Sequence, residues 1–259
     1  MGSNRTPRGT LVLAIAVLIA FVVAALPPLA AARVERDVSP EEQATIDAIN
    51  ARNEELGYDW VAGPTSVSHL SPEEKANLLG GEFPPELMDD VPQAPPVPDA
   101  ALRNLRTSFD WRDYGGTTPP DDQEDCGSCW AFGAVGAVEA RVRINSGVVT
   151  DLSEQQMIDC NFQGSDCDGG FSGHAYQIMQ DPGGKLESCY PYLATSGTSC
   201  RGGGCEIAAV IDGYTSISND ESLIKYYVEN FGPVSTGMHV YNDFYSYGGG
   251  CYEHAGEDP

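Results

Sequence analysis

The sequence predicts a disulfide-containing domain organised around helices, without the alternation of strands and helices that a parallel sheet requires. Residues 130–144 contain no proline and carry apolar residues at nearly every turn, and residues 145–147 then supply a stop signal. Residues 152–160 predict a second helix, because a serine cap is followed three residues later by glutamine. All eight cysteines lie within residues 126–251, which favours an exported protein with disulfide bonds.

The N-terminal end of the chain has the layout of a secretory signal peptide. Arg5 and Arg8 precede an apolar run of sixteen residues over 11–26, and Ala30–Ala32 offers a cleavage site. Sixteen residues is short for a membrane span, which needs about 20. We therefore predict a signal peptide over residues 1–32 and secretion. Contact with a membrane is expected only if the segment stays uncleaved as an anchor.

The chain has 259 residues and a formal net charge of −24 at pH 7. At that length it can hold one large domain or two modest ones. The negative charge excludes nucleic acid as a partner and argues against binding to anionic membrane surfaces. The surplus of acidic side chains is typical of a well-solvated surface, and adaptation to high salt is the alternative interpretation.

Residues 33–106 have the organisation of a propeptide. Ser39 and Ser71 each precede a proline and two glutamates, which predicts two helices that begin with a serine cap and a capping box. Six prolines then fall within residues 84–98, so we predict an extended, protease-accessible linker without regular structure. A signal peptide, a helical segment, a linker and a catalytic domain from residue 107 onward follow the order of a zymogen.

The stretch over residues 123–132 places a cysteine where a helix begins. Cys129 would lie beside unpaired backbone N–H groups and the positive end of the helix dipole, and both favour the nucleophilic thiolate. Gln123, six residues upstream, carries an amide that could donate a hydrogen bond to an oxyanion forming beside that sulfur. This pattern indicates a cysteine nucleophile with an oxyanion donor.

The Cys-Gly-Ser-Cys-Trp motif at residues 126–130, with its glutamine upstream, resembles the nucleophile motif of papain and the cathepsins. The resemblance implies a two-domain α+β fold over residues 107–259, with a helical domain and an antiparallel β domain that is incomplete. It implies Cys129 as the catalytic nucleophile, Gln123 as the oxyanion donor and Cys126 as half of a structural disulfide. Other stretches resemble cathepsin B and cathepsin C within this family.

Two cysteines separated by two residues also occur in zinc sites and in thioredoxin-like redox proteins. A zinc site needs a second such pair or two histidines at suitable spacing, and the sequence has neither downstream. A thioredoxin-like site needs a βαβ pattern around the motif, which is also missing. The ten-residue match with its positioned glutamine is more specific than either alternative, so we expect no metal and no cofactor.

A glycine-rich loop follows the second predicted helix and resembles the substrate-binding loop of the family. Glycines let a substrate backbone approach closely enough to pair as a short strand. By resemblance, Gly169 and Gly170 bind the substrate main chain, and Phe171 borders the S2 pocket, which receives the second residue before the scissile bond. Gly237, in the strand that enters the β domain, is expected to face the same pocket.

The resemblance also implies three disulfides and leaves Cys251 without a partner. Sequence alone allows fifteen pairings of six cysteines, so these pairs remain implications of the family likeness. The implied pairs are Cys126–Cys167, Cys160–Cys200 and Cys189–Cys205, of which the last resembles an added bridge of cathepsin C.

A papain-like site also needs a histidine to pair with the thiolate, roughly 130–150 residues after the cysteine. His69 lies in the propeptide, and a structural or surface role is expected for His174 and His239. His254 is followed by alanine, as in the family, but not by the apolar strand that should come next. We predict that the catalytic histidine and its asparagine lie beyond Pro259 and that the chain as written is inactive.

Together the motifs predict a secreted papain-like cysteine endopeptidase, made as a zymogen, that cleaves peptides through a thioester on Cys129. The stretch from Tyr192 to Cys205 is too short for the histidine-bearing loop that makes cathepsin B a dipeptidyl-carboxypeptidase. The expected partners are a peptide or protein substrate and the propeptide acting as inhibitor, on a monomer. The alternatives are a catalytically inactive binding protein of the same fold and a redox protein that uses both cysteines of the motif.

Overall fold

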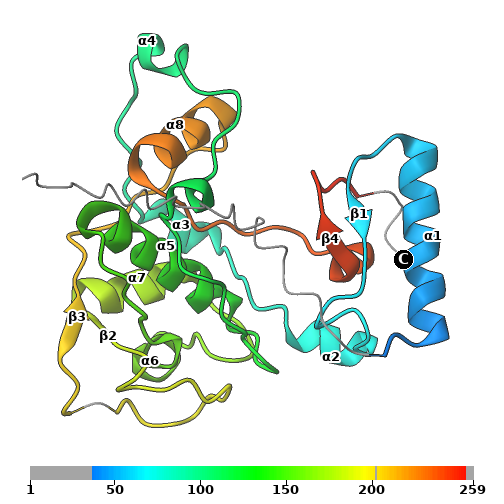
Figure 1. Ribbon diagram of the computed structural model, residues 1–259. Helices are drawn as coiled ribbons and strands as arrows, with labels where there is room; N and C mark the ends of the chain where they lie inside the picture. Colours follow the sequence, from blue (N-terminus) through cyan, green and yellow to red (C-terminus); the bar gives the residue numbers. More distant parts are fainter. Residues whose placement is uncertain (1–36, 202, 255–259) are drawn as a thin grey trace, which may run out of the picture. The chain divides into compact units, whose positions relative to one another are not determined.

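The computed structural model describes residues 37–201 and 203–254, so the predicted signal peptide lies outside the described residues. In that part of the chain most regular structure is helical, and the strands form two antiparallel pairs, β1–β4 and β2–β3 (Figure 1). No helix among the described residues is long and apolar enough to cross a membrane. The elements in chain order are α1 (Pro40–Leu56), β1 (Val61–Ala62), α2 (Pro72–Asn77), α3 (Pro85–Asp89), α4 (Asp99–Leu102), the 3-10 helix η1 (Trp111–Tyr114), α5 (Cys129–Ser146), α6 (Glu154–Cys160), α7 (Ser172–Gln180), β2 (Gly184–Lys185), β3 (Ile207–Ala209), α8 (Glu221–Phe231), the 3-10 helix η2 (Asn242–Ser246) and β4 (Tyr247–Gly249).

Both serine-capped helices of the N-terminal segment begin where the sequence predicts them. The Ser39 hydroxyl accepts a hydrogen bond from the backbone N–H of Glu42 at 3.1 Å, and the Glu42 carboxylate accepts one from Ser68. Helix α2 has the complete capping box, in which Ser71 and Glu74 each accept from the other's backbone N–H. Short-range capping therefore fixes the starts of α1 and α2.

Helix α1 and strand β1 form a small hydrophobic cluster with the last described residues. Ile46 and Trp60 are buried, and the Trp60 ring lies 5.1 Å from the Tyr252 ring in an edge-on arrangement. Strand β1 pairs with β4, and Val61 is opposite Gly249. These contacts join the beginning of the described chain to its end.

The main hydrophobic core lies between α5, α6 and α7, which lie together in Figure 1. Helix α5 carries small and apolar side chains on its buried side, and it ends at Gly147, whose φ of 73° is left-handed backbone that glycine adopts without strain. Twelve buried residues form this core: Cys126, Trp130, Ala131, Ala134, Val135, Val138, Leu152, Met157, Ile158, Ala175, Ile178 and Met179.

Helix α6 begins with a serine cap as predicted, but its capping box is not closed. Ser153 accepts a hydrogen bond from the Gln156 backbone N–H at 3.0 Å. The Gln156 side chain instead accepts from the Lys185 N–H at 2.7 Å and donates to the Gly183 carbonyl at 2.9 Å. Because this amide is buried, two partners in and directly before the neighbouring strand satisfy it better than the end of its own helix. Gln156 therefore ties α6 to β2.

The proline-rich stretch contains more regular structure than the sequence predicts, so the expectation of a wholly irregular linker is wrong. Pro85 begins α3, because a proline in the first turn of a helix needs no N–H partner and has a suitable φ. Gln93 forms a parallel bridge with Ser216, and the Ala94 N–H donates to the Ser216 carbonyl at 2.8 Å. Prolines at the starts of short elements are compatible with local order.

A buried carboxyl group lies at the start of α6. Glu154 is only 6% exposed, and burial, with the nearby carboxylates of Glu139 and Glu187, raises its pKa to about 9. Burial also raises the pKa of Glu139, although that carboxylate accepts hydrogen bonds from the Leu152 N–H at 2.7 Å and the Thr118 hydroxyl at 2.8 Å. The fold therefore favours the protonated form of Glu154.

We predict that Glu154 makes the folded protein less stable as the pH rises. The folded-state pKa lies above the ordinary value of 4.5, so the stabilisation is fully present below that pH and is lost as the pH rises towards 9. Within this window one group changes the free energy of unfolding by about 1.4 kcal/mol per pH unit. The free energy of unfolding, measured with urea, should fall less between pH 5 and pH 8 for Glu154→Gln than for the wild type. An equal fall in both would contradict the prediction, and exposed Glu206→Gln is the control.

Candidate active site

Cys129 is the first residue of α5, the longest helix of the core region. Its thiol is free and its side chain is half-buried. The residue before it, Ser128, occupies the N-cap position, but its side chain makes no capping hydrogen bond. The start of the helix therefore keeps backbone N–H groups that no N-cap side chain occupies, and these favour negative charge beside the sulfur.

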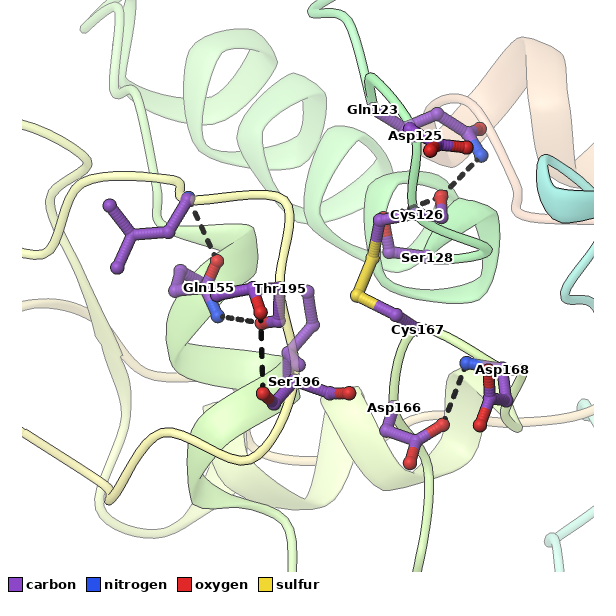
Figure 2. Close-up of a disulfide and its surroundings, with 12 residues drawn as sticks. Gln123, Asp125, Cys126, Ser128, Gln155, Asp166, Cys167, Asp168, Thr195 and Ser196 are labelled. Carbon is purple, nitrogen blue, oxygen red and sulfur yellow. Dashed lines mark hydrogen bonds between the residues drawn. A yellow bond between two sulfur atoms is a disulfide. The ribbon is translucent and has the colours of Figure 1, made fainter. Parts of the chain in front are cut away.

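The loop before the nucleophile is bonded covalently to the glycine-rich loop. Cys126 and Cys167 form a disulfide with a Cα–Cα distance of 4.7 Å (Figure 2). The Gly127 N–H also donates to the Cys167 carbonyl at 2.8 Å. The motif cysteines therefore do not bond to each other. All three pairs that the family likeness implied are present, the others being Cys160–Cys200 and Cys189–Cys205, while Cys251 is free and exposed.

The side-chain amide of Gln123 points towards the N-terminal segment of the same chain. Its Nε2 donates to the Leu78 carbonyl at 2.9 Å and to the Cys126 carbonyl at 2.8 Å, the second of which is drawn in Figure 2. A carbonyl oxygen therefore occupies the donor that the sequence assigns to an oxyanion. The next residue, Glu124, has a φ of 49°, so the backbone turns sharply after Gln123.

Gly170 pairs through its backbone with the same N-terminal segment. The Glu82 N–H donates to the Gly170 carbonyl at 2.9 Å, and the Gly170 N–H donates to the Gly80 carbonyl at 2.8 Å. Gly81 and Gly170 form the resulting parallel bridge. Gly170 thus binds an extended chain through both main-chain groups, which is the type of contact that the sequence predicts for a substrate.

The N-terminal segment passes close to the nucleophile because two glycines let the backbones approach. A methyl group on Gly80 would lie 1.7 Å from the Gly127 carbonyl oxygen, so no other residue fits there without movement. A methyl group on Gly81 would lie 4.0 Å from the Cys129 sulfur. Residues 78–82 therefore lie beside the nucleophile and bind both the oxyanion donor and the strand-pairing glycine.

The two residues expected at the S2 pocket lie in different surroundings. Gly237 lies against the ring of Phe83, since a methyl group on Gly237 would be 2.1 Å from that ring. Phe171 is buried, and its ring packs edge-on against His174 at 5.5 Å. Gly169 has a φ of 141° and lies beside Gly80. The structure brings Gly169, Gly170 and Gly237 against residues 80–83.

His174 and His254 have polar partners other than the nucleophile. His174 is buried, its Nδ1 lies 2.7 Å from the Ser165 hydroxyl, and burial lowers its pKa. His254 stacks on Tyr241 at 3.8 Å and pairs with the Asp243 carboxylate at 3.1 Å. Among residues 37–201 and 203–254, no hydrogen bond joins a histidine to Cys129. The identity of the general base stays a sequence prediction.

This chain matches the model of the "Papain family cysteine protease" over residues 105–258, which is more than half of its length. The chain belongs to the papain family of cysteine proteases. The predictions of this family and of an α+β fold are thereby confirmed.

Relatives and solved structures support the papain-family assignment. The chain is 32% identical over 205 residues to "Cysteine proteinase 1" of Dictyostelium discoideum, covering 75% of this chain and 58% of that protein. It is 38% identical over 152 residues to "Digestive cysteine proteinase 1" of Homarus americanus, covering 56% of this chain and 47% of that one. The digestive procathepsin L2 of Tenebrio molitor larval midgut has a TM-score of 0.65 and 28% identity, covering 74% and 63% of the two chains. This chain spans about half the length of the curated relatives it matches.

The motif of this papain-family chain did not reveal which residues bind Gln123 and Gly170. Leu78 and Gly80 provide the carbonyl groups that Gln123 and Gly170 bind, and neither carries a distinctive side chain. The one sequence signal was the pair of glycines at 80–81, which follows a predicted helix and permits close backbone contact.

We predict that Gly80→Ala exposes the nucleophile. The added methyl group cannot lie 1.7 Å from the Gly127 oxygen, so residues 78–82 must move away from the loop that precedes Cys129. A clash that costs about 1–3 kcal/mol corresponds to roughly a 5- to 150-fold rise in the open population. The rate of Cys129 alkylation by iodoacetamide should rise accordingly, measured by mass spectrometry of the Cys129 peptide. Gly63→Ala is the matched control, because no atom lies within 4 Å of the added methyl group. Equal alkylation rates in Gly80→Ala and Gly63→Ala would contradict the prediction.

Proposed function

We propose that the full-length protein is a secreted cysteine endopeptidase that is made as a zymogen. The observation that carries the proposal is the segment at residues 78–83, which directly follows α2. It binds the Gln123 amide and the Gly170 backbone, and it lies beside Cys129. A segment that uses the contacts of a substrate and belongs to the same chain is suited to act as an intramolecular inhibitor. Structures of procathepsins among the structural relatives support the same interpretation.

In the proposed reaction, the Cys129 thiolate attacks the carbonyl carbon of a peptide bond. The oxyanion accepts hydrogen bonds from the Gln123 amide and the Cys129 backbone N–H. The C–N bond then breaks, and the amine leaves with a proton supplied by an imidazole, which leaves a thioester on Cys129. Water attacks the thioester, releases the carboxylic acid and restores the thiol. No cofactor takes part in these steps.

The N-terminal segment competes with substrate at three places. The Leu78 carbonyl occupies the oxyanion donor, residues 80–82 occupy Gly170, and Phe83 lies against Gly237, which the family likeness assigns to the S2 pocket. A tethered segment has an effective concentration in the millimolar range, so it competes strongly until it is cut or released. Substrate can bind only after these contacts have opened.

The cysteines support secretion, and they favour a peptidase over a redox protein. Three disulfides in the described chain are suited to an oxidising compartment, which agrees with a cleaved signal peptide. The Cys126–Cys167 bond leaves Cys129 free, which favours a nucleophile over a redox pair of the two motif cysteines. A non-catalytic binding protein of the same fold would not need Gln123 and Cys129 together. We propose that the enzyme acts as a monomer on peptide or protein substrates.

The test is hydrolysis of an unselective fluorogenic peptide by the full-length protein after its N-terminal segment has been removed. Cys129→Ala should abolish turnover because it removes the nucleophile. Gln123→Ala should lower kcat about 100- to 1,000-fold, because it removes one oxyanion donor. Turnover that persists in Cys129→Ala would contradict the proposal, and a wild type without turnover would favour the binding protein. Glu206→Gln is the control, since that side chain is exposed.

A further inference from the structure

The Tyr192 hydroxyl forms hydrogen bonds with both Gln123 and Ser128. It donates a hydrogen bond to the Gln123 main-chain carbonyl at 2.8 Å. The Ser128 hydroxyl lies 2.8 Å from the Tyr192 hydroxyl oxygen. Gln123 carries the oxyanion donor, and Ser128 directly precedes Cys129. One phenol group therefore connects the backbone of the donor to the start of the nucleophile helix.

The protons of this arrangement can be assigned from its donors and acceptors. A tyrosine hydroxyl has one proton, and the Gln123 carbonyl can only accept, so the Tyr192 proton lies on that bond. The Ser128 proton then has two acceptors, the Tyr192 oxygen at 2.8 Å and the Cys126 carbonyl oxygen at 3.4 Å, and the shorter distance favours donation to Tyr192. The result is a chain from Ser128 through Tyr192 to Gln123, and Ser128 is fully buried. Successive hydrogen bonds of this type strengthen one another in a buried setting.

Gln123 needs such support because its backbone is at a sharp turn. Glu124 has a φ of 49°, a left-handed conformation that costs a residue other than glycine of the order of 1 kcal/mol. An oxyanion donor acts only if its N–H lies about 3 Å from the developing charge, so small backbone shifts reduce catalysis. A contact that holds the Gln123 carbonyl opposes such shifts.

Tyr192 is itself firmly held. Its backbone N–H donates to the Glu187 carboxylate at 2.6 Å, and its ring packs edge-on against Phe132 at 5.1 Å. Burial, together with the acidic side chains around it, raises the pKa of Tyr192 to about 12. The hydroxyl therefore remains protonated, and able to donate, in neutral and acidic solution.

We propose that Tyr192 is a positioning residue for the oxyanion donor, acting through its hydrogen bond to the Gln123 backbone. The proposal rests on the cysteine-peptidase function proposed above. Tyr192 touches no reacting atom, and its effect on catalysis passes through Gln123. It should raise kcat by keeping the Gln123 amide aimed at the oxyanion, with little effect on substrate binding.

The test compares Tyr192→Phe with Tyr190→Phe in the activated full-length protein. Each change removes one phenol oxygen, and the Tyr190 hydroxyl bonds to Asp159 and Arg201 instead of the site. Tyr192→Phe should lower kcat about fivefold to tenfold with KM unchanged. Tyr190→Phe should leave kcat unchanged. The rate of Cys129 alkylation should be the same in both variants, because the nucleophile is unaltered.

A double variant separates a positioning role from a structural one. In a Gln123→Ala background, Tyr192→Phe should cause no further loss of kcat, because the group that it positions is gone. A full additional loss, an unchanged kcat in Tyr192→Phe, or a tenfold change in the alkylation rate would overturn the proposal. If Tyr192→Phe does not fold, Ser128→Ala takes its place, because it weakens the same chain of bonds. Ser128→Ala must then lower kcat about twofold to threefold, and it must cause no further loss in the Gln123→Ala background. If the proposed peptidase function itself is wrong, the turnover of the wild type will not depend on Cys129, which separates that failure from failure of the Tyr192 proposal.

Discussion

The structure depends on the close approach of three backbone segments at Gly127. Its N–H donates to the Cys167 carbonyl, and a methyl group there would lie 2.6 Å from that oxygen and 3.0 Å from the Leu79 carbonyl oxygen. The loop before the nucleophile, the glycine-rich loop and the N-terminal segment therefore meet where there is no room for a side chain. The Cys126–Cys167 disulfide holds two of these segments together, and the third fits the remaining gap.

The parts of the site that could be predicted are those whose chemistry is local. Cys129 and Gln123 lie within seven residues of each other, and the helix signal that follows them places the cysteine at a helix start. The family and the α+β fold follow from the same short stretch. The starts of α1 and α2 were also predictable, because a serine cap acts within three residues.

The remaining features depend on partners that are distant in the sequence. The bond between Gln123 and Leu78 spans 45 positions and uses a main-chain carbonyl, which is the same in every residue. The bond from Tyr192 to Gln123 spans 69 positions. Gln156 shows the same effect within a helix, because its amide bonds to β2 instead of closing the predicted capping box. Tertiary contacts outweigh local preference where a polar group is buried.

The pairing of β1 with β4 has a consequence for any cleavage that separates residues 40–62 from the rest of the chain. Without residues 40–62, β4 would lose the strand that pairs with it, and Tyr247 and Tyr252 would lose the Trp60 ring that packs on them. An aromatic surface beside an open strand edge is a site for rebinding or for self-association. The excised segment would therefore be a natural ligand for the surface that it leaves, and its dilution or digestion would decide whether the separation lasts.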